Sequence, residues 1–232
     1  MTHNFVGIVL KKRNWRENDL EIIFFSPFYG KMRLIATGAR KFQSKLSGHL
    51  EPFNEVKIML AEGKVTDKIG QAVCQKSFLN QKKIIDWEAG WAAQTSADFL
   101  DKILPEKQAE PRIYQLFKNY LLLLARTEAK KISPLFNWQL IILSGFSPIL
   151  DHCANCGGEV EKQGIKFSVS KGGLLCQKCL LPSLKIDLKK IKILKHLVTN
   201  SGLKKAWIKL TEKEALDLGN LFYQFYSYHI LK

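Results

Sequence analysis

The 232-residue sequence contains no hydrophobic run long enough to cross a membrane. Its longest apolar stretches, such as YLLLLA, fall far short of the roughly 20 residues that a membrane helix needs. The first residues, MTHNFVGIVLKKR, lack the basic, apolar and small-residue segments of a secretory signal peptide. We therefore expect a cytoplasmic protein whose cysteine thiols stay reduced.

The sequence also lacks the short motifs of common enzyme classes. It has no phosphate-binding loop of the GxxxxGKS or GxxxxGKT type, no HExxH motif and no GxSxG nucleophile elbow. Acidic residues are scarce, with 21 against 36 basic residues and a net charge of +15. We therefore expect no enzymatic activity. The charge predicts a polyanionic partner, such as a nucleic acid, an anionic membrane or an acidic peptide.

The first third of the chain has the two-residue apolar period of β-strands. Turn signals separate five segments, which predicts a five-stranded OB-type barrel. The long break from Thr37 to Pro52 is expected to carry a cap or a binding loop. The alternating residues are Val6, Ile8 and Leu10, then Leu20, Ile22 and Phe24, then Met32, Leu34 and Ala36, then Val56, Ile58 and Leu60, and a weaker run from Val65 to Val73.

Beyond Asn80 the apolar period becomes helical. The expected fold class is therefore α+β. An OB-fold domain is expected over residues 1–80. A helical domain is expected over residues 81–232, interrupted by a cysteine segment at residues 150–182.

Several local signals mark helices in this second half. The stretch SPLFNWQLIILSG predicts a helix that begins at its Ser-Pro pair and ends at Gly145. Thr211 and Glu214 form a capping box that predicts the start of the last helix. The predicted apolar stripes are Trp87, Trp91, Phe99 and Ile103; Ile113, Leu116, Phe117, Tyr120, Leu121 and Leu124 after Pro111; Leu184, Leu188, Ile191, Leu194 and Val198; and Leu218, Leu221, Phe222, Phe225 and His229.

Four cysteines form two CxxC pairs, Cys153 with Cys156 and Cys176 with Cys179, separated by nineteen residues. Two such pairs favour one tetrahedral zinc ion, and four thiolates close its coordination shell, as in a structural site. Two disulfides are the alternative, which a reducing compartment disfavours. Lysines and glutamates are mixed between the pairs, so the segment has no basic helix to read a DNA groove.

Two other candidate residues have simpler interpretations. His152 adjoins the first cysteine and could replace a thiolate, but four cysteines already suffice, so we interpret it as a flanking polar residue. Cys74 lies in the last predicted strand with no histidine close in sequence. It is therefore expected to be a small buried apolar residue rather than a nucleophile.

Basic residues concentrate between positions 11 and 45, where nine stand against three acidic residues. Aromatic residues lie among them at Trp15, Phe28, Tyr29 and Phe42. Cations for phosphates and rings for unpaired bases are what single-strand binding requires. The alternative is a solvated basic face with its rings tucked into the barrel. The candidate DNA-binding residues are Lys11, Arg13, Trp15, Arg16, Lys31, Arg33, Arg40, Lys41 and Lys45.

A second basic cluster, Lys185 to Lys213, holds nine lysines against two acidic residues. Lysines on the polar side of a helix are usually only solvated. The sharper hypothesis is a docking surface for an acidic peptide.

The whole chain resembles a known bacterial family. The stretch GIVLKKRNWRENDLEIIFFSPFYGKMRLIATGARKFQSKLSGHLEPFNEVKI contains G-x-V-L, E-N-D, G-x-x-R and G-A-R elements, followed by L-E-P-F. In that order these elements are similar to the N-terminal region of the RecO family of recombination mediators. The phrases LSGFSPILDHCANCG and SKGGLLCQKC resemble the C-terminal half of the same family.

The resemblance implies an OB-fold domain followed by a helical domain with a zinc-binding segment. It implies binding of single- and double-stranded DNA, annealing of complementary strands, and a location at the nucleoid. With RecR, and in functional linkage to RecF, such a protein would help to load RecA onto DNA coated by single-strand-binding protein. The helical domain would contact the acidic C-terminal tail of that protein. Candidate residues for this docking are Lys195, Lys204, Lys205 and Lys209.

Residue by residue, the resemblance carries zinc binding over to the four cysteines. DNA contact carries over only as basic regions, in which Arg13, Arg16, Arg33, Arg40, Lys41 and Lys45 are favoured. Two other function classes stay open. One is an RNA-binding accessory factor of translation with an OB fold and structural zinc, and the other is an adaptor that binds only proteins.

Overall fold

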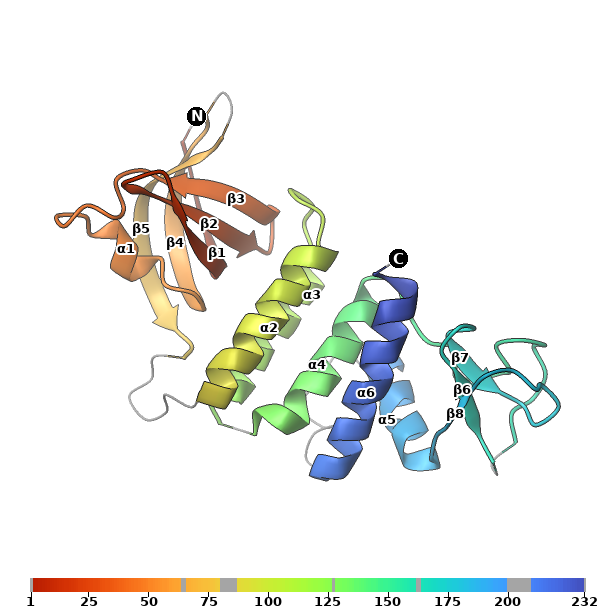
Figure 1. Ribbon diagram of the computed structural model, residues 1–232. Coiled ribbons are helices and arrows are strands. Elements are labelled where there is room, and N and C mark those ends of the chain that lie inside the picture. The colour runs from red at the N-terminus through yellow and green to blue at the C-terminus, as the bar shows by residue number, and fades with distance from the viewer. Residues whose placement is uncertain are drawn as a thin grey trace. The chain divides into compact units, whose positions relative to one another are not determined.

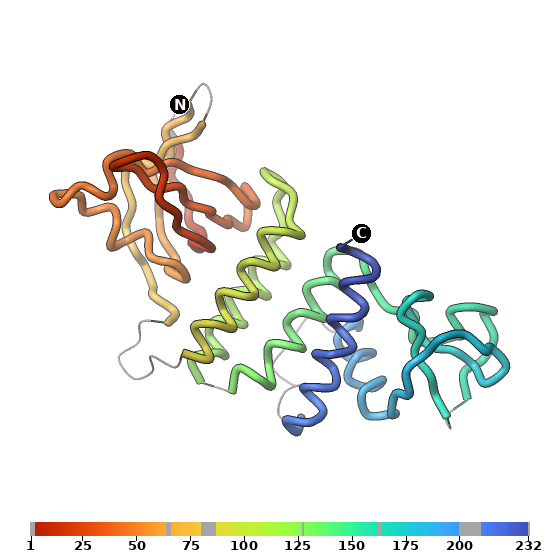
Figure 2. Tube along the Cα trace, in the orientation of Figure 1, coloured from red at the N-terminus to blue at the C-terminus, as the bar shows by residue number. Residues whose placement is uncertain are grey.

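The computed structural model describes residues 2–63, 66–79, 87–126, 128–161, 164–199 and 210–231. The chain forms two compact units, Met1–Ala129 and Lys130–Lys232. Figures 1 and 2 show a barrel and two helices in the first unit, and helices with a small sheet in the second. Among the described helices, none combines the length and the apolar composition that crossing a membrane requires.

Five strands form a closed barrel in the first unit (Figure 1). They are β1 (Thr2–Trp15), β2 (Asp19–Ser26), β3 (Gly30–Ala36), β4 (Asn54–Ala61) and β5 (Lys68–Ser77). The order around the barrel is β1-β2-β3-β5-β4, with β3 and β5 parallel and the other neighbours antiparallel. This confirms the OB-type barrel. Of the weak fifth run, residue 65 lies outside the described residues.

Residues 7–11 of β1 and most of β2 are buried on both faces. Phe24 lies in the barrel interior, whereas its neighbour Phe25 is equally buried on the opposite face, where its ring contacts Tyr114. In β1, Phe5 and Val9 belong to the barrel core, whereas the alternating residues Ile8 and Leu10 are buried outside it. The alternation therefore predicted the strand, and both of its faces are apolar because helices cover the outside of the barrel.

The long connection between β3 and β4 contains the short helix α1 (Leu46–His49). Ala39 and Leu50 from this connection are buried in the barrel core, and Leu46 packs against it. The expected cap is therefore present. The polar part of the connection, around residues 40–43, is exposed to solvent.

Two helices complete the first unit, α2 (Trp87–Ile103) and α3 (Pro111–Leu124). The helix α2 contacts β1 and α3, and α3 contacts β2. The predicted stripe of α3 is buried, and Pro111 occupies the first turn. The predicted stripe of α2 is wrong for its tryptophans, since Trp87 and Trp91 are exposed. The buried residues of α2 are Ala89, Ala92, Ala93, Ser96, Ala97, Phe99 and Leu100.

Small side chains explain this choice of face in α2, because alanines let a helix approach its neighbours more closely than indole rings would. Two hydrogen bonds mark the close contact with α3. Ser96 Oγ donates to Tyr120 Oη at 3.0 Å, and Tyr120 Oη donates to the carbonyl of Ala92 at 3.3 Å. On the barrel side of α3, the buried carboxylate of Glu55 accepts from Tyr114 Oη at 2.9 Å and also from Lys118.

The second unit contains α4 (Ala129–Leu143), α5 (Leu188–Thr199) and α6 (Glu212–His229). Its small sheet, of order β7-β6-β8, is formed by β6 (Lys166–Ser168), β7 (Gly173–Leu175) and β8 (Leu184–Lys185). The predicted capping box of α6 is confirmed. In the core, Trp138 Nε1 donates to the carbonyl of Leu218 at 3.0 Å, and its ring contacts Phe225 at 5.2 Å between centroids.

Two sequence predictions in this unit were wrong. The helix α4 begins at Ala129 and not at the Ser-Pro pair, so Pro134 lies inside it. A proline removes one backbone donor but need not end a helix that tertiary packing holds. Leu184 lies in β8, and both Leu188 and Val198 are exposed, so the predicted stripe through α5 holds only in its middle.

Candidate nucleic-acid interface and metal centre

Arg40 joins two loops at one end of the barrel, the β1–β2 turn and the β3–α1 connection. Its backbone N–H donates to the carbonyl of Asn18 at 2.9 Å. Its guanidinium donates to the carbonyls of Glu17 at 2.9 Å and Arg16 at 3.4 Å. The two loops therefore form one surface. We call it the loop surface and define it by its exposed residues Trp15, Arg16, Arg40, Lys41, Phe42 and Lys45.

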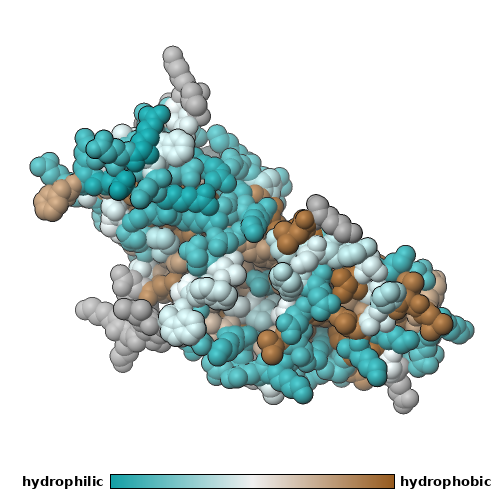
Figure 3. Space-filling model, in the orientation of Figure 1, coloured by the Kyte–Doolittle hydropathy of each residue, from teal (hydrophilic) through white to brown (hydrophobic). Residues whose placement is uncertain are grey.

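Three cations of the loop surface form no ion pair in the part of the chain that the structure describes. Among the described residues, no carboxylate lies within ion-pair distance of Arg16, Lys41 or Lys45. The barrel face visible in the space-filling view is mainly hydrophilic (Figure 3). The loop surface can therefore offer positive charge to a phosphate backbone without first breaking an internal ion pair.

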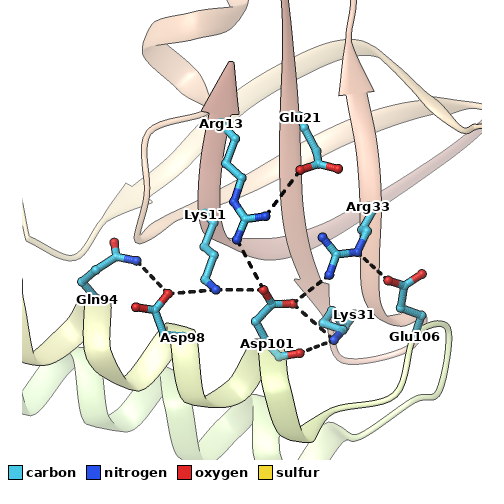
Figure 4. A network of polar contacts seen from close by, with 9 residues as sticks. All are labelled: Lys11, Arg13, Glu21, Lys31, Arg33, Gln94, Asp98, Asp101 and Glu106. Atoms are coloured by element: carbon cyan, nitrogen blue, oxygen red, sulfur yellow. Dashed lines mark hydrogen bonds and ion pairs between the residues drawn. The ribbon is translucent and has the colours of Figure 1, made fainter. Parts of the chain in front are cut away.

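Other predicted DNA-binding residues lie in a different place, against α2 (Figure 4). Lys11 Nζ lies 2.8 Å from both Asp98 Oδ1 and Asp101 Oδ2. Lys31 Nζ donates to the backbone carbonyl of Asp101 and lies 3.3 Å from its Oδ1. The side chains of Lys11 and Lys31 are only 10% and 5% exposed. This burial leaves neither ammonium group open to a phosphate.

Two arginines lie at the edge of this same network. Arg33 Nε donates to Glu106 Oε1 at 2.6 Å and its Nη2 donates to Asp101 Oδ1 at 3.3 Å. The hydrogen bond to Glu106 raises the pKa of Arg33, with further support from the charges of Asp101 and Glu106 and against the effect of burial. Arg13 is half exposed, and its guanidinium lies 3.9 Å from both Glu21 and Asp101. Of Lys11, Arg13, Lys31 and Arg33, Arg13 therefore has the most exposed side chain and the longest ion-pair distances.

Asp101 is the centre of this network. Burial alone would raise its pKa, but hydrogen bonds and charge from Lys11, and then from Lys31, outweigh burial and lower the pKa below its ordinary value. An ionised Asp101 therefore holds α2 on the barrel. Sequence reasoning missed this role, although Asp98 and Asp101 have the three-residue spacing that places two carboxylates on one face of a helix.

The aromatic candidates also separate into two groups. Phe28 and Tyr29 lie on the β2–β3 turn, where the Tyr29 ring contacts Phe5 at 4.5 Å between centroids. Phe42 and Trp15 belong to the loop surface, with exposed fractions of 105% and 44%. Of these four aromatic residues, only Trp15 and Phe42 adjoin basic residues, Arg16 and Lys41, that form no ion pair among the described residues.

The four cysteines of the second unit converge on one point. The Sγ atoms of Cys153 and Cys179 lie 3.8 Å apart, those of Cys156 and Cys176 lie 3.7 Å apart, and all four lie within 4.8 Å of one another. Disulfide sulfurs would lie about 2.05 Å apart, so these thiols are free. Four sulfurs about 2.3 Å from a tetrahedral ion are about 3.8 Å apart, which fits the observed spacing.

Backbone geometry forms the two cysteine turns. In the first turn, Cys153 N–H donates to the carbonyl of Gly158 at 2.8 Å, and Gly157 N–H donates back to the carbonyl of Cys153 at 2.9 Å. Gly157 has a φ of 73°, a conformation that suits glycine. The second turn follows β7, and Ala154 N–H ties the first turn to Leu174 in β7 at 2.7 Å. These hydrogen bonds position the two cysteine turns next to each other.

The sulfur environments favour binding of a cation. Burial disfavours the Cys153 thiolate, but N–H groups of Cys176, Cys156 and Asn155 lower its pKa to about 6. The side chain of Asn155 favours the Cys179 thiolate, but burial and the neighbouring sulfurs raise its pKa to about 11. The neighbouring sulfurs therefore oppose a thiolate at Cys179, and a bound cation would offset this repulsion.

The structure describes only some of the remaining predicted residues. Lys195 is half exposed and pairs with Asp151 at 2.8 Å. Lys204, Lys205 and Lys209 lie outside the described residues. His152 is not part of the metal-ligating cluster. Cys74 is half buried, and its backbone N–H donates to His49 Nδ1 at 3.3 Å, a histidine that sequence distance did not indicate.

The comparisons with known proteins cover both halves of the chain. Residues 1–78 match the family model described as "Recombination protein O N terminal", and residues 86–232 match "Recombination protein O C terminal". The chain belongs to the RecO family. The DNA repair protein RecO of Desulforamulus reducens is 30% identical over 229 residues, which cover 97% of this chain and 89% of the relative.

Other RecO proteins give similar matches. The DNA repair protein RecO of Dehalococcoides mccartyi is 31% identical over 84% of this chain and 77% of its own length. That of Oceanobacillus iheyensis is 28% identical over 98% of this chain and 88% of its own length. The family is thus one of DNA repair proteins.

The two RecO regions do not coincide with the two compact units. The N-terminal family model ends near the end of the barrel, whereas the first compact unit also includes α2 and α3. The buried carboxylates of Asp101 and Glu55 account for this difference, because each joins one of these helices to a barrel strand. The domain limits at residues 80 and 81 stay a prediction.

Proposed function

We propose that this RecO-family chain is a DNA repair and recombination mediator that binds single- and double-stranded DNA, anneals complementary strands and makes or breaks no covalent bond. With RecR, and linked to RecF, it would help to load RecA onto DNA coated by single-strand-binding protein, at the nucleoid in the cytoplasm. One observation carries the DNA-binding part: the loop surface presents Arg16, Lys41 and Lys45 without acidic partners among the described residues.

Within this proposal the predicted residues have two different roles. Arg16, Arg40, Lys41, Lys45 and Trp15 contact DNA, with Arg13 and Arg33 at the margin. Lys11 and Lys31 instead hold α2 on the barrel through Asp101. Each lysine or arginine that neutralises a phosphate releases condensed counterions, so binding should weaken steeply as salt rises. Reduced repulsion between two bound strands would favour annealing.

The metal centre supports the proposal of one structural Zn²⁺ ion held by Cys153, Cys156, Cys176 and Cys179. The sulfur spacing fits tetrahedral coordination, and all four positions are filled by protein ligands, so none is left for water or substrate. The segment also packs on α6, where His229 Nε2 donates to the carbonyl of Val169 at 2.7 Å. The ion would therefore contribute folding free energy to the second unit.

The acidic tail of single-strand-binding protein is proposed to dock on the second unit through Lys195, Lys204, Lys205 and Lys209. The support is charge complementarity. Lys195 is half exposed, and its present partner Asp151 is itself highly exposed. An exposed ion pair of this kind contributes little free energy, so a multiply charged peptide could displace Asp151.

The DNA-binding proposal is tested by reversing charge on the loop surface. Lys41→Glu with Lys45→Glu is preferred to a change at Arg40, because Arg40 hydrogen-bonds both loops together. The matched control is Lys57→Glu with Lys68→Glu, which makes the same charge change at exposed positions of β4 and β5.

We expect the loop variant to weaken binding to both single-stranded and duplex DNA and to reduce the slope of log Kd against log salt by about 2. The control should bind nearly as well as the unmodified protein. Equal binding by the loop variant and the unmodified protein would overturn the proposal. Tighter binding to RNA than to single-stranded DNA of matched sequence would favour the RNA-binding alternative.

A further inference from the structure

Phe42 is the most exposed large apolar residue among those described. Its exposed fraction is 105%, so its ring has lost no solvent contact on folding. Burying a phenylalanine side chain contributes roughly 1.5–3 kcal/mol. The exposed Phe42 ring does not contribute this stabilisation, although Ala39 and Leu50 of the same connection are buried in the barrel core. A ring left out of the core while its neighbours enter it requires an explanation.

The backbone around Phe42 is fixed by hydrogen bonds on both sides. Gly38 N–H donates to Asp19 Oδ1 at 2.7 Å, and Lys41 N–H donates to the carbonyl of Gly38 at 3.1 Å. After the ring, Ser44 N–H donates to the carbonyl of Lys41 at 2.9 Å. Gly38 has a φ of 65°, a left-handed conformation that glycine adopts readily. The connection thus holds the ring outward in a defined turn.

Basic residues flank Phe42 in the chain. Lys41 precedes it and Lys45 follows, and neither has an acidic partner among the described residues. Arg40, two residues earlier, hydrogen-bonds the turn that follows Trp15. An outward ring beside uncommitted cations combines the two contacts that an unpaired nucleotide offers, a flat base and a phosphate.

We propose that Phe42, together with the exposed Trp15 of the same loop surface, stacks on unpaired bases and makes this surface selective for single-stranded DNA. This inference rests on the proposed DNA-binding function. Bases in a duplex already stack on each other, so a ring gains a stacking partner there only if the duplex opens. Phosphates, in contrast, are present in both forms. The cations of the loop surface therefore supply affinity for any DNA, and the rings supply the preference for single strands.

The β2–β3 turn does not have the same combination. Phe28 is 78% exposed, but the basic residues that follow it, Lys31 and Arg33, are paired with acids of the Asp101 network. Tyr29 packs on Phe5. Phe28→Ala is therefore a matched control for Phe42→Ala, since both changes remove an exposed phenyl ring from a loop.

The test measures Kd for an oligothymidine strand and for a blunt duplex at several salt concentrations. Phe42→Ala should weaken single-strand binding by about tenfold, which is a typical loss for one stacked base. It should leave duplex binding and the salt slope unchanged, and Phe42→Trp should restore binding. Phe28→Ala should change neither affinity. The Phe42 ring is fully exposed and packs against nothing in the core, so the Phe42→Ala protein should remain folded.

The outcomes separate this inference from the proposed function. If Lys41→Glu with Lys45→Glu weakens binding but Phe42→Ala does not, the stacking role is wrong and the DNA-binding proposal stands. Equal losses for single strands and duplex in Phe42→Ala would also overturn the selectivity. If the charge variant binds normally, the proposed function itself fails.

Discussion

Replacing Asp101 with asparagine tests whether one buried carboxylate fixes α2 to the barrel. The Asp101 side chain is 9% exposed and faces Lys11, Lys31 and Arg33. Asparagine keeps the shape and one carbonyl oxygen but removes the charge. Lys11 retains Asp98 as a partner, whereas the buried ammonium of Lys31 retains only the backbone carbonyl of residue 101.

The expected loss of stability follows from this geometry. Removing one partner of a buried ion pair costs about 3–5 kcal/mol, and the retained oxygen and backbone contact reduce the loss, so we expect about 2–4 kcal/mol. The matched control is Asp98→Asn on the same helix. Asp98 is about half exposed, and Lys11 is its ion-pair partner among the described residues of the network, so its loss should be about 0–1 kcal/mol.

Urea unfolding of the full chain, followed by circular dichroism, measures both variants. The pH dependence gives a second readout. Asp101 has a folded-state pKa below its ordinary value of 3.8, so its stabilising effect is complete above that value. The effect is lost as the pH falls from there through the folded-state pKa. The asparagine variant should lack this acid-dependent component. The reasoning is refuted if Asp101→Asn unfolds at the same urea concentration as Asp98→Asn.

Two further predictions concern the second unit. Cys176→Ser should abolish stoichiometric zinc, measured by atomic emission, and lower the thermal stability of the helical part, because a structural ion contributes to folding. Cys74→Ser, outside the cysteine cluster, is the control, and a zinc-free Cys176→Ser protein with unchanged melting would contradict the structural role. Lys195→Glu should reduce capture by the immobilised acidic tail of single-strand-binding protein, whereas Lys57→Glu should not. Undiminished capture would place the docking site elsewhere.

Local sequence patterns predicted the elements whose cause is local. The two cysteines of each CxxC pair lie together because a short turn joins them, and the capping box of Thr211 and Glu214 involves residues three apart. The barrel strands were also found from their period. The period does not tell which face of β1 is the inner one, because Ile8 and Leu10 are as buried as Val9 where helices cover the barrel. A period of two cannot distinguish the faces of a strand that is apolar on both.

The sequence patterns did not predict ion pairs between residues that are far apart in the chain. Lys11 and Asp101 are ninety residues apart, and a composition count around Lys11 includes neither Asp98 nor Asp101. The basic cluster of residues 11–45 therefore looked like one DNA-binding region. In the same way, the tryptophans of α2 suggested a buried face, and the alanines that fit against α3 and the barrel were overlooked.

The distribution of acids, more than that of bases, therefore defines the proposed DNA interface. Lys11 and Lys31 have the same side chain as Lys41 and Lys45, but the carboxylate of Asp101 commits the first pair to holding α2. No described carboxylate lies within ion-pair distance of the second pair. Within residues 11–45, the described cations on the strands are paired with carboxylates, most of them with Asp101 and its neighbouring acids, whereas those without a described carboxylate partner lie at the loop surface. The same ion pairs that stabilise the first unit thus also restrict where DNA is expected to bind.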